Sequence, residues 1–148
     1  MKEYAVNKRA YFDYEILETL EAGIELYGLE VKAIKTGRMA LSGSYAIIRG
    51  NELWLINASI APYQQKNTPS DYDPARSRKI LLHRSEIKGL IGAAAQKGLT
   101  IMPLKVYPKR GRIKVLIGLA RYKKTRDKRE TIKKRDAKRE IERIIKRG

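Results

Sequence analysis

The chain has 148 residues, 33 of them Lys or Arg against 16 Asp or Glu, which gives a formal net charge of +17 and a pI near 10.1. Hydrophobic residues make up 43%, enough for one domain with a core, so a chain disordered throughout is excluded. The surplus of cations favours a polyanion as partner, either nucleic acid or an anionic membrane surface. Without any Cys, disulfides and thiolate zinc sites are excluded.

The longest apolar stretch, residues 89–95, is far shorter than the roughly 20 residues needed to cross a bilayer. The first residues, MKEYAVNKRAY, contain no apolar segment typical of a secretion signal. We therefore expect a cytoplasmic protein with no membrane partner.

Charge divides the chain into two parts. Residues 121–148 carry 14 basic and 5 acidic side chains, a net charge of +9, whereas residues 1–120 carry a net charge of +8. Ala137, Ile141, Ile144 and Ile145 form a narrow stripe at helical spacing, too small to build a core. The pattern predicts a body at 1–120 and a basic C-terminal tail at 121–148 that is disordered alone and helical against a partner.

The first elements of the body are short. Residues 14–26 are rich in β-formers, but Ile16, Leu20 and Ile24 also fit helical spacing. Residues 44–49 and 52–57 read as two strands joined by a tight turn at Gly50 and Asn51. Residues 62–75 lack periodicity and are predicted to be an exposed loop.

The second half of the body adds a helix and three more strands. Residues 78–82 form a candidate strand, Ser85 can cap a helix that ends at Lys97 and Gly98, and strands 99–107 and 112–120 flank a turn at 108–111. Short antiparallel strands with one inserted helix favour a mainly β fold. An OB-like Greek-key barrel with peripheral helices is the economical choice for a basic protein of this size.

No nucleotide-binding loop, metalloprotease motif or Ser/His/Asp set is present, so no catalytic residue, metal or cofactor is predicted. His83 is the only imidazole and reads as a structural or surface residue. Asp71 and Asp73 could hold a divalent ion beside a phosphate, as in a nuclease, but their place before Pro74 is typical of a turn.

Two cationic clusters favour an RNA surface. Asn7, Lys8 and Arg9 stand beside an aromatic ring and could hold phosphates and an unpaired base; the alternative is a basic helix in solvent. Arg78 and Lys79 belong to a second cluster, for which the alternative is a barrel edge protected by charge.

Over nearly the whole chain, a series of sequence blocks resembles, in the same order, those of the small protein B family, the bacterial partner of tmRNA in trans-translation. The blocks are NKRA (7–10), DYEILETLEAGI (13–24), GLEVKAIKTGR (28–38), SYA (44–46), IAPY (60–63), DPARSRKILLH (73–83), KGLTIMPLKVY (97–107), KVLIGLA (114–120) and DKRETIKKRDAKREIER (127–143). The resemblance implies an OB-like barrel without enzymatic activity that binds the tRNA-like domain of tmRNA. It also implies delivery of alanyl-tmRNA, with elongation factor Tu and GTP, to stalled ribosomes.

The resemblance implies roles for individual residues. Asn7, Glu21 and Leu81 stand where family members need the residue for tmRNA binding, and Glu30 and Lys32 lie in the matching GLEVK block. Asn7 is interpreted as a surface amide suited to RNA, Glu21 as a group that orients a basic or backbone partner, and Leu81 as a packing residue or an apolar contact under a base.

The tail is expected to occupy the small-subunit decoding centre and the empty mRNA path. Its candidate residues share positive charge or an aromatic ring near the DKR motif, and are Tyr122, Lys123, Lys124, Arg126, Asp127, Lys128, Arg129, Lys133, Lys134 and Arg135. Arg126 replaces the His or aromatic residue that commonly precedes DKR, so the stacking contact could fall to Arg126 or Tyr122. A ribosomal protein and a metal-dependent nuclease remain alternatives.

Overall fold

The computed structural model describes residues 2–124, 129, 132–135 and 139. The strands are β1 (Ala5–Val6), β2 (Tyr14–Ile24), β3 (Met39–Ala40), β4 (Tyr45–Arg49), β5 (Glu52–Ile56), β6 (Ser59–Ile60), β7 (Arg78–Leu81), β8 (Thr100–Lys109) and β9 (Arg112–Tyr122). The helices are α1 (Lys8–Asp13), α2 (Gly28–Lys35), α3 (Arg84–Lys97) and a 3-10 turn at Gln65–Asn67.

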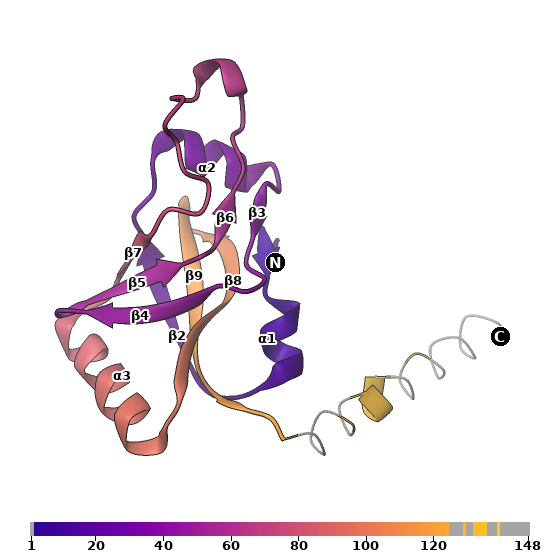
Figure 1. The fold of residues 1–148 in the computed structure, drawn as a ribbon, viewed down its shortest axis with the longest axis vertical. Coiled ribbons are helices and arrows are strands. Elements are labelled where there is room, and N and C mark those ends of the chain that lie inside the picture. The colour runs from indigo at the N-terminus through magenta and orange to yellow at the C-terminus, as the bar shows by residue number, and fades with distance from the viewer. Residues whose placement is uncertain (1, 125–128, 130–131, 136–138, 140–148) are drawn as a thin grey trace.

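Seven strands form one sheet in the order β1-β8-β9-β2-β7-β5-β4, and β3 pairs with β6. Every pairing is antiparallel, and β4 also approaches β8, so the sheet curls around its core (Figure 1). Register shifts at Ile16/Glu18 and at Pro103/Lys105 bend the two longest pairings. The prediction of a mainly β, OB-like fold with peripheral helices is confirmed.

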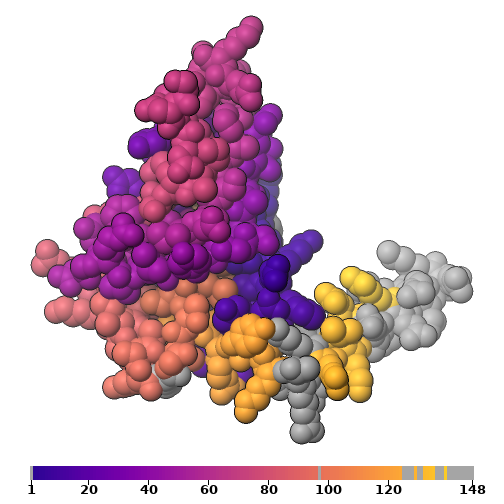
Figure 2. All heavy atoms as spheres, viewed as in Figure 1, coloured from indigo at the N-terminus to yellow at the C-terminus, as the bar shows by residue number. Residues whose placement is uncertain are grey.

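The helices lie at different ends of the barrel. In Figure 1, α3 lies below β4 and β5, α1 lies beside β8, and α2 lies at the opposite end with residues 61–76. Figure 2 shows that 61–76 project above the barrel as a narrow protrusion. The prediction of a loop there holds, with one turn of 3-10 helix near its tip.

Alternating apolar residues of β2, β5, β8 and β9 fill the core, together with Ile34 of α2 and Leu90 of α3. Gly118 is required by close packing, because a Cβ there would lie 2.7 Å from Leu104 Cδ1. The β8–β9 hairpin turns at Arg110 and Gly111, both with positive φ, and the strands extend closer to the turn than predicted.

The structure settles one ambiguous element and moves the start of one predicted helix. Residues 14–24 are a strand, because Leu20 pairs with Ile117 across β9 and adds to the core on the sheet period. Helix α3 begins at Arg84 with His83 as its N-cap residue, not Ser85, since the Glu86 carboxylate accepts the His83 backbone N–H at 3.0 Å. Gly98 is the left-handed C-cap, as predicted.

The body extends past residue 120. Strand β9 ends at Tyr122, and the backbone N–H of Lys123 donates to the Asp13 carbonyl at 2.8 Å. Residues 129, 132–135 and 139 are helical. The prediction of a tail that is disordered alone depends on residues outside those described.

Candidate RNA interface

Two residues expected at the RNA surface, Glu30 and Arg78, form a buried ion pair, and both side chains are fully enclosed. The Arg78 Nε lies 2.8 Å from Glu30 Oε2, and Arg76 also binds this carboxylate. Arg78 further donates to the carbonyls of Ala58 and Pro74, each at 2.9 Å. A guanidinium with its donors used internally cannot hold phosphate, so in this structure Glu30 and Arg78 act through the ion pair and do not offer a surface to RNA.

This cluster fixes the charge on Glu30. Burial alone would raise the pKa of Glu30, but hydrogen bonds from Arg76, the Tyr27 backbone and Arg78 lower it below its ordinary value. The Tyr72 hydroxyl donates to the same carboxylate at 3.1 Å, and burial together with the charge of Glu30 raises the Tyr72 pKa. The network therefore fastens the 61–76 segment to α2.

Asn7 is also internal, with only 2% of its surface exposed. Its Nδ2 donates to the Pro103 carbonyl at 2.9 Å, and its Oδ1 accepts the Ala10 backbone N–H at 3.2 Å, capping α1. The backbone N–H of Asn7 donates to the Leu104 carbonyl at 2.8 Å. The interpretation of Asn7 as a surface amide is wrong, because its side chain joins α1 to β8.

Lys8 and Arg9 are exposed on α1, as a phosphate contact requires. The Arg9 side chain is 74% exposed and lies 3.4 Å from Asp13. Residues 8–13 therefore form a basic helix exposed to solvent, which was the alternative interpretation, and its cations remain accessible to RNA.

Leu81 lies in a groove of about 390 Å³ between β2, β7, α2 and the β8–β9 hairpin. We call this the basic groove; it is lined by Gly23, Ile24, Leu26, Val31, Lys35, Leu81, Gly111, Arg112, Ile113 and Lys114. Leu81 is 47% exposed, which favours the second of its two interpretations, an apolar contact under a base, over a packing role. A Cβ at Gly23 would lie 3.3 Å from Leu81 Cβ, so glycine keeps this wall of the groove low.

Glu21 lies on β2 close to this groove and orients a basic group, as predicted. Its carboxylate accepts the Tyr107 hydroxyl and lies 3.1 Å from the Lys109 ammonium. The hydrogen bond from Tyr107, followed by that from Lys109, lowers the Glu21 pKa. Burial and the bond to Glu21 raise the pKa of Tyr107. Glu21 thus stays ionised and orients Lys109, which lies on the same hairpin as Arg112 and Lys114 of the groove.

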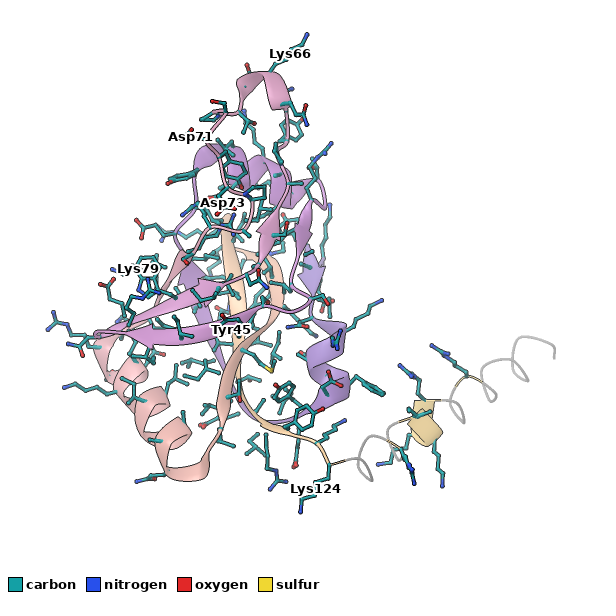
Figure 3. The ribbon with its side chains drawn as sticks, viewed as in Figure 1. Tyr45, Lys66, Asp71, Asp73, Lys79 and Lys124 are labelled. Atoms are coloured by element: carbon teal, nitrogen blue, oxygen red, sulfur yellow. The ribbon has the colours of Figure 1, made fainter. Side chains whose placement is uncertain are left out.

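The other two expected body residues lie apart from the basic groove. Lys79 pairs with Glu52 at 2.7 Å, and this hydrogen bond raises the Lys79 pKa. Lys79, labelled in Figure 3, lies on β7, an inner strand of the sheet, where it pairs with Trp54 of β5. Lys32 is exposed on α2 and lines a different hollow, of about 360 Å³, together with Tyr63. The expected RNA-binding residues therefore do not form a single surface.

Tyr122 belongs to β9 rather than to a separate tail. Its ring is 59% exposed and meets Tyr14 edge to face, with centroids 5.4 Å apart. Tyr14, Tyr122 and Tyr45 line a hollow of about 750 Å³ beside Arg9. Three rings and a cation in one hollow suit RNA bases and phosphate.

The other tail candidates differ in where the structure places them. The Lys123 Nζ donates to the Tyr11 carbonyl at 3.4 Å, and Lys124 is exposed below the barrel (Figure 3). The Arg135 guanidinium lies 5.4 Å from the Phe12 ring centroid. Arg129, Lys133 and Lys134 are exposed and helical. Arg126, Asp127 and Lys128 lie outside the described residues.

Sequence reasoning missed the cations that line or border the basic groove, which are Lys35, Lys109, Arg112 and Lys114. They are spread over 80 residues of sequence and meet only through the β2–β9 pairing and α2. The turn signal with two cations at 108–111 was the one available clue. In the described part of the chain, no cluster of three or more His, Cys, Asp or Glu could hold a metal, and no helix is long and apolar enough to span a membrane.

Comparisons with known proteins agree with this architecture. The family model described as SmpB protein matches residues 4–147. The SsrA-binding protein of Synechococcus elongatus is 51% identical over 148 residues, covering 100% of this chain and 96% of the relative. That of Gloeothece citriformis is 55% identical over 141 residues, covering 95% and 91%.

A solved structure described as "tmRNA-SmpB: a journey to the center of the bacterial ribosome" is 49% identical to this chain, with a TM-score of 0.66. The match covers 86% of this chain and 92% of that one. Matches of this length include both the barrel and most of the basic C-terminal segment. The chain belongs to the SmpB (small protein B) family.

Proposed function

We propose that this protein binds the tRNA-like domain of tmRNA and acts with it in the rescue of stalled ribosomes. The basic groove carries the proposal, because an exposed Leu81 stands there beside Lys35, Arg112 and Lys114. The names of the relatives, which are SsrA-binding proteins, support tmRNA as the RNA.

The groove combines the two kinds of contact that a folded RNA needs. Ammonium and guanidinium groups neutralise phosphates along its rim and displace condensed counterions. The apolar wall formed by Ile24 and Leu81 suits a sugar or the face of an unstacked base. Glu21 repels phosphate from its own position and keeps Lys109 in place, so shape as well as charge selects the RNA.

The remaining steps follow from the family resemblance. The protein delivers alanyl-tmRNA, with elongation factor Tu and GTP, to ribosomes whose A site lacks a codon. The segment 121–148 then occupies the decoding centre of the small subunit and the vacant mRNA path. This work on ribosomes places the protein in the cytoplasm, and binding, not catalysis, accounts for each step.

The groove is tested by measuring the affinity for the tRNA-like domain over a range of salt concentrations. Arg112→Ala and Lys114→Ala should each weaken binding and reduce the slope of log K against log salt by about one phosphate contact. The matched control is Lys88→Ala, which removes an exposed cation from α3, outside the groove. If the control weakens binding as much as the two groove variants, the RNA does not bind at the groove.

The tail is tested by ending the chain after Lys124. The groove lies entirely within residues 23–114, so binding of the tRNA-like domain should persist. Peptide tagging on ribosomes stalled at a truncated mRNA should be lost. Normal tagging by the shortened chain would contradict the role assigned to the tail.

A further inference from the structure

The end of the barrel that carries α2 and the 61–76 segment has a second exposed aromatic surface, separate from the basic groove. Tyr27 immediately precedes α2 and is 54% exposed, and the Arg76 guanidinium lies 3.8 Å from its ring centroid. A guanidinium at this distance covers one face of the ring, and the 54% exposure of Tyr27 leaves surface open to a ligand. This is the arrangement of a stacking platform.

The buried ion pair holds this platform rigid. Arg76 binds the Glu30 carboxylate, and the Tyr27 backbone N–H donates to the same carboxylate at 2.8 Å. The ring and the cation that covers it are thus both tied to one enclosed anion. The surface is already ordered before a base stacks on it, so binding costs less conformational entropy than it would on a mobile side chain.

The ring opens onto a hollow of about 520 Å³, which we call the Tyr27 hollow; it is lined by Tyr27, Leu29, Pro69, Asp71, Tyr72, Asp73 and Arg76. Figure 3 shows Asp71 and Asp73 between the barrel and the protruding tip at Lys66. The Asp73 Oδ1 already accepts the Ala75 backbone N–H at 2.9 Å. Among the described residues, no hydrogen bond or ion pair is found for Asp71, so both of its oxygens can accept.

These groups select a particular base. A carboxylate accepts two parallel hydrogen bonds, and guanine alone among the RNA bases presents two adjacent donors, N1–H and N2–H, on its Watson–Crick edge. The two carboxylates repel phosphate from the hollow, so the base enters and its backbone stays outside. The adjoining hollow offers Lys32 for that backbone and Tyr63 for a neighbouring base, and it shares Leu29 with the Tyr27 hollow.

We propose that the Tyr27 hollow binds one unpaired guanine of a single-stranded RNA segment, with Tyr27 stacking on the base and Asp71 accepting from N1–H and N2–H. The site goes beyond the proposed function, because none of its residues lines the basic groove.

The test measures the affinity of the full chain for fluorescent pentaribonucleotides at constant ionic strength. UUGUU should bind about tenfold more tightly than UUUUU, and UUIUU, whose inosine lacks the N2 amino group, should fall between them. Tyr27→Ala should weaken UUGUU binding about tenfold, whereas Tyr27→Phe should keep it. Asp71→Asn should bring the affinities for UUGUU and UUIUU together.

Two controls separate this site from the others. Tyr45→Ala removes an exposed tyrosine at a different hollow and should leave the ratio of UUGUU to UUUUU affinity unchanged. Arg112→Ala should weaken binding of the tRNA-like domain and leave the ratio of UUGUU to UUUUU affinity unchanged. Equal affinity for UUGUU and UUUUU would overturn the proposal, and so would a fall of the UUGUU to UUUUU affinity ratio toward one in either control variant. Neither result would contradict the binding of tmRNA at the basic groove.

Discussion

Replacing Glu30 with Gln tests how strongly the buried ion pair supports the α2 end of the molecule. The substitution keeps the size of the side chain and removes the one carboxylate that pairs with Arg78 among the described residues, and the Arg78 side chain is fully enclosed. Breaking a buried pair in this way typically costs about 3 to 5 kcal/mol. Arg78 retains its bonds to the carbonyls of Ala58 and Pro74, so we expect the lower value, about 3 kcal/mol.

The assays are urea unfolding and thermal unfolding, each monitored by circular dichroism. A loss of about 3 kcal/mol corresponds to a fall of about 10 °C in the melting temperature of a chain of this size. Glu52→Gln is the matched control, because it breaks the exposed pair with Lys79, in which the side chains are 37% and 46% exposed, and should cost less than about 1 kcal/mol. Equal losses in the two variants would refute the argument that burial makes the Glu30 pair important.

The remaining predictions concern pH and the cap of α1. Because the folded pKa of Glu30 lies below its ordinary value of 4.5, its stabilising contribution is full above about pH 4.5 and is lost as the pH falls through the folded pKa. The free energies of unfolding of the wild type and of Glu30→Gln should therefore converge as the pH is lowered, which urea unfolding at several pH values between about pH 7 and pH 3 would measure. If another group were responsible, the two plots of unfolding free energy against pH would stay parallel. Asn7→Ala should lower stability by about 2 kcal/mol, because it removes the cap on Ala10 and leaves the buried Pro103 carbonyl without its side-chain donor. An unchanged melting temperature for Asn7→Ala would show that the cap contributes nothing.

The parts of the fold that follow local rules were predictable from the sequence. The β4–β5 hairpin is set by alternation and by Gly50, whose φ is +64°, and the end of α3 is set by Gly98. Helix α2 was missed because Val31 and Ile34 are weak helix formers, and no conventional cap residue precedes Gly28. Its helical state depends on packing of Ala33 and Ile34 into the core, which is tertiary information.

The site was less predictable, because a list of cations does not say which face they occupy. Arg78 on β7 and Arg76, two residues before that strand begins, both turn toward Glu30, which lies 48 and 46 residues earlier in the chain. Conversely, Leu81 looks like a core residue in the run KILL and lies exposed at the end of β7. Only the pairing of β7 with β2 and β5 decides which side of each strand faces solvent.

The enclosed polar residues separate two ways in which a substitution can impair RNA binding. Arg112 and Leu81 face the groove, so their loss should change affinity while the free energy of unfolding stays nearly constant. Asn7 and Glu30 face inward, so any loss of RNA affinity on their replacement must come through movement of α1 or of α2, and must be accompanied by lower stability. A requirement for Asn7 in RNA binding is thus compatible with its burial, and the ratio of lost affinity to lost stability tells the positioning residues from those that touch RNA.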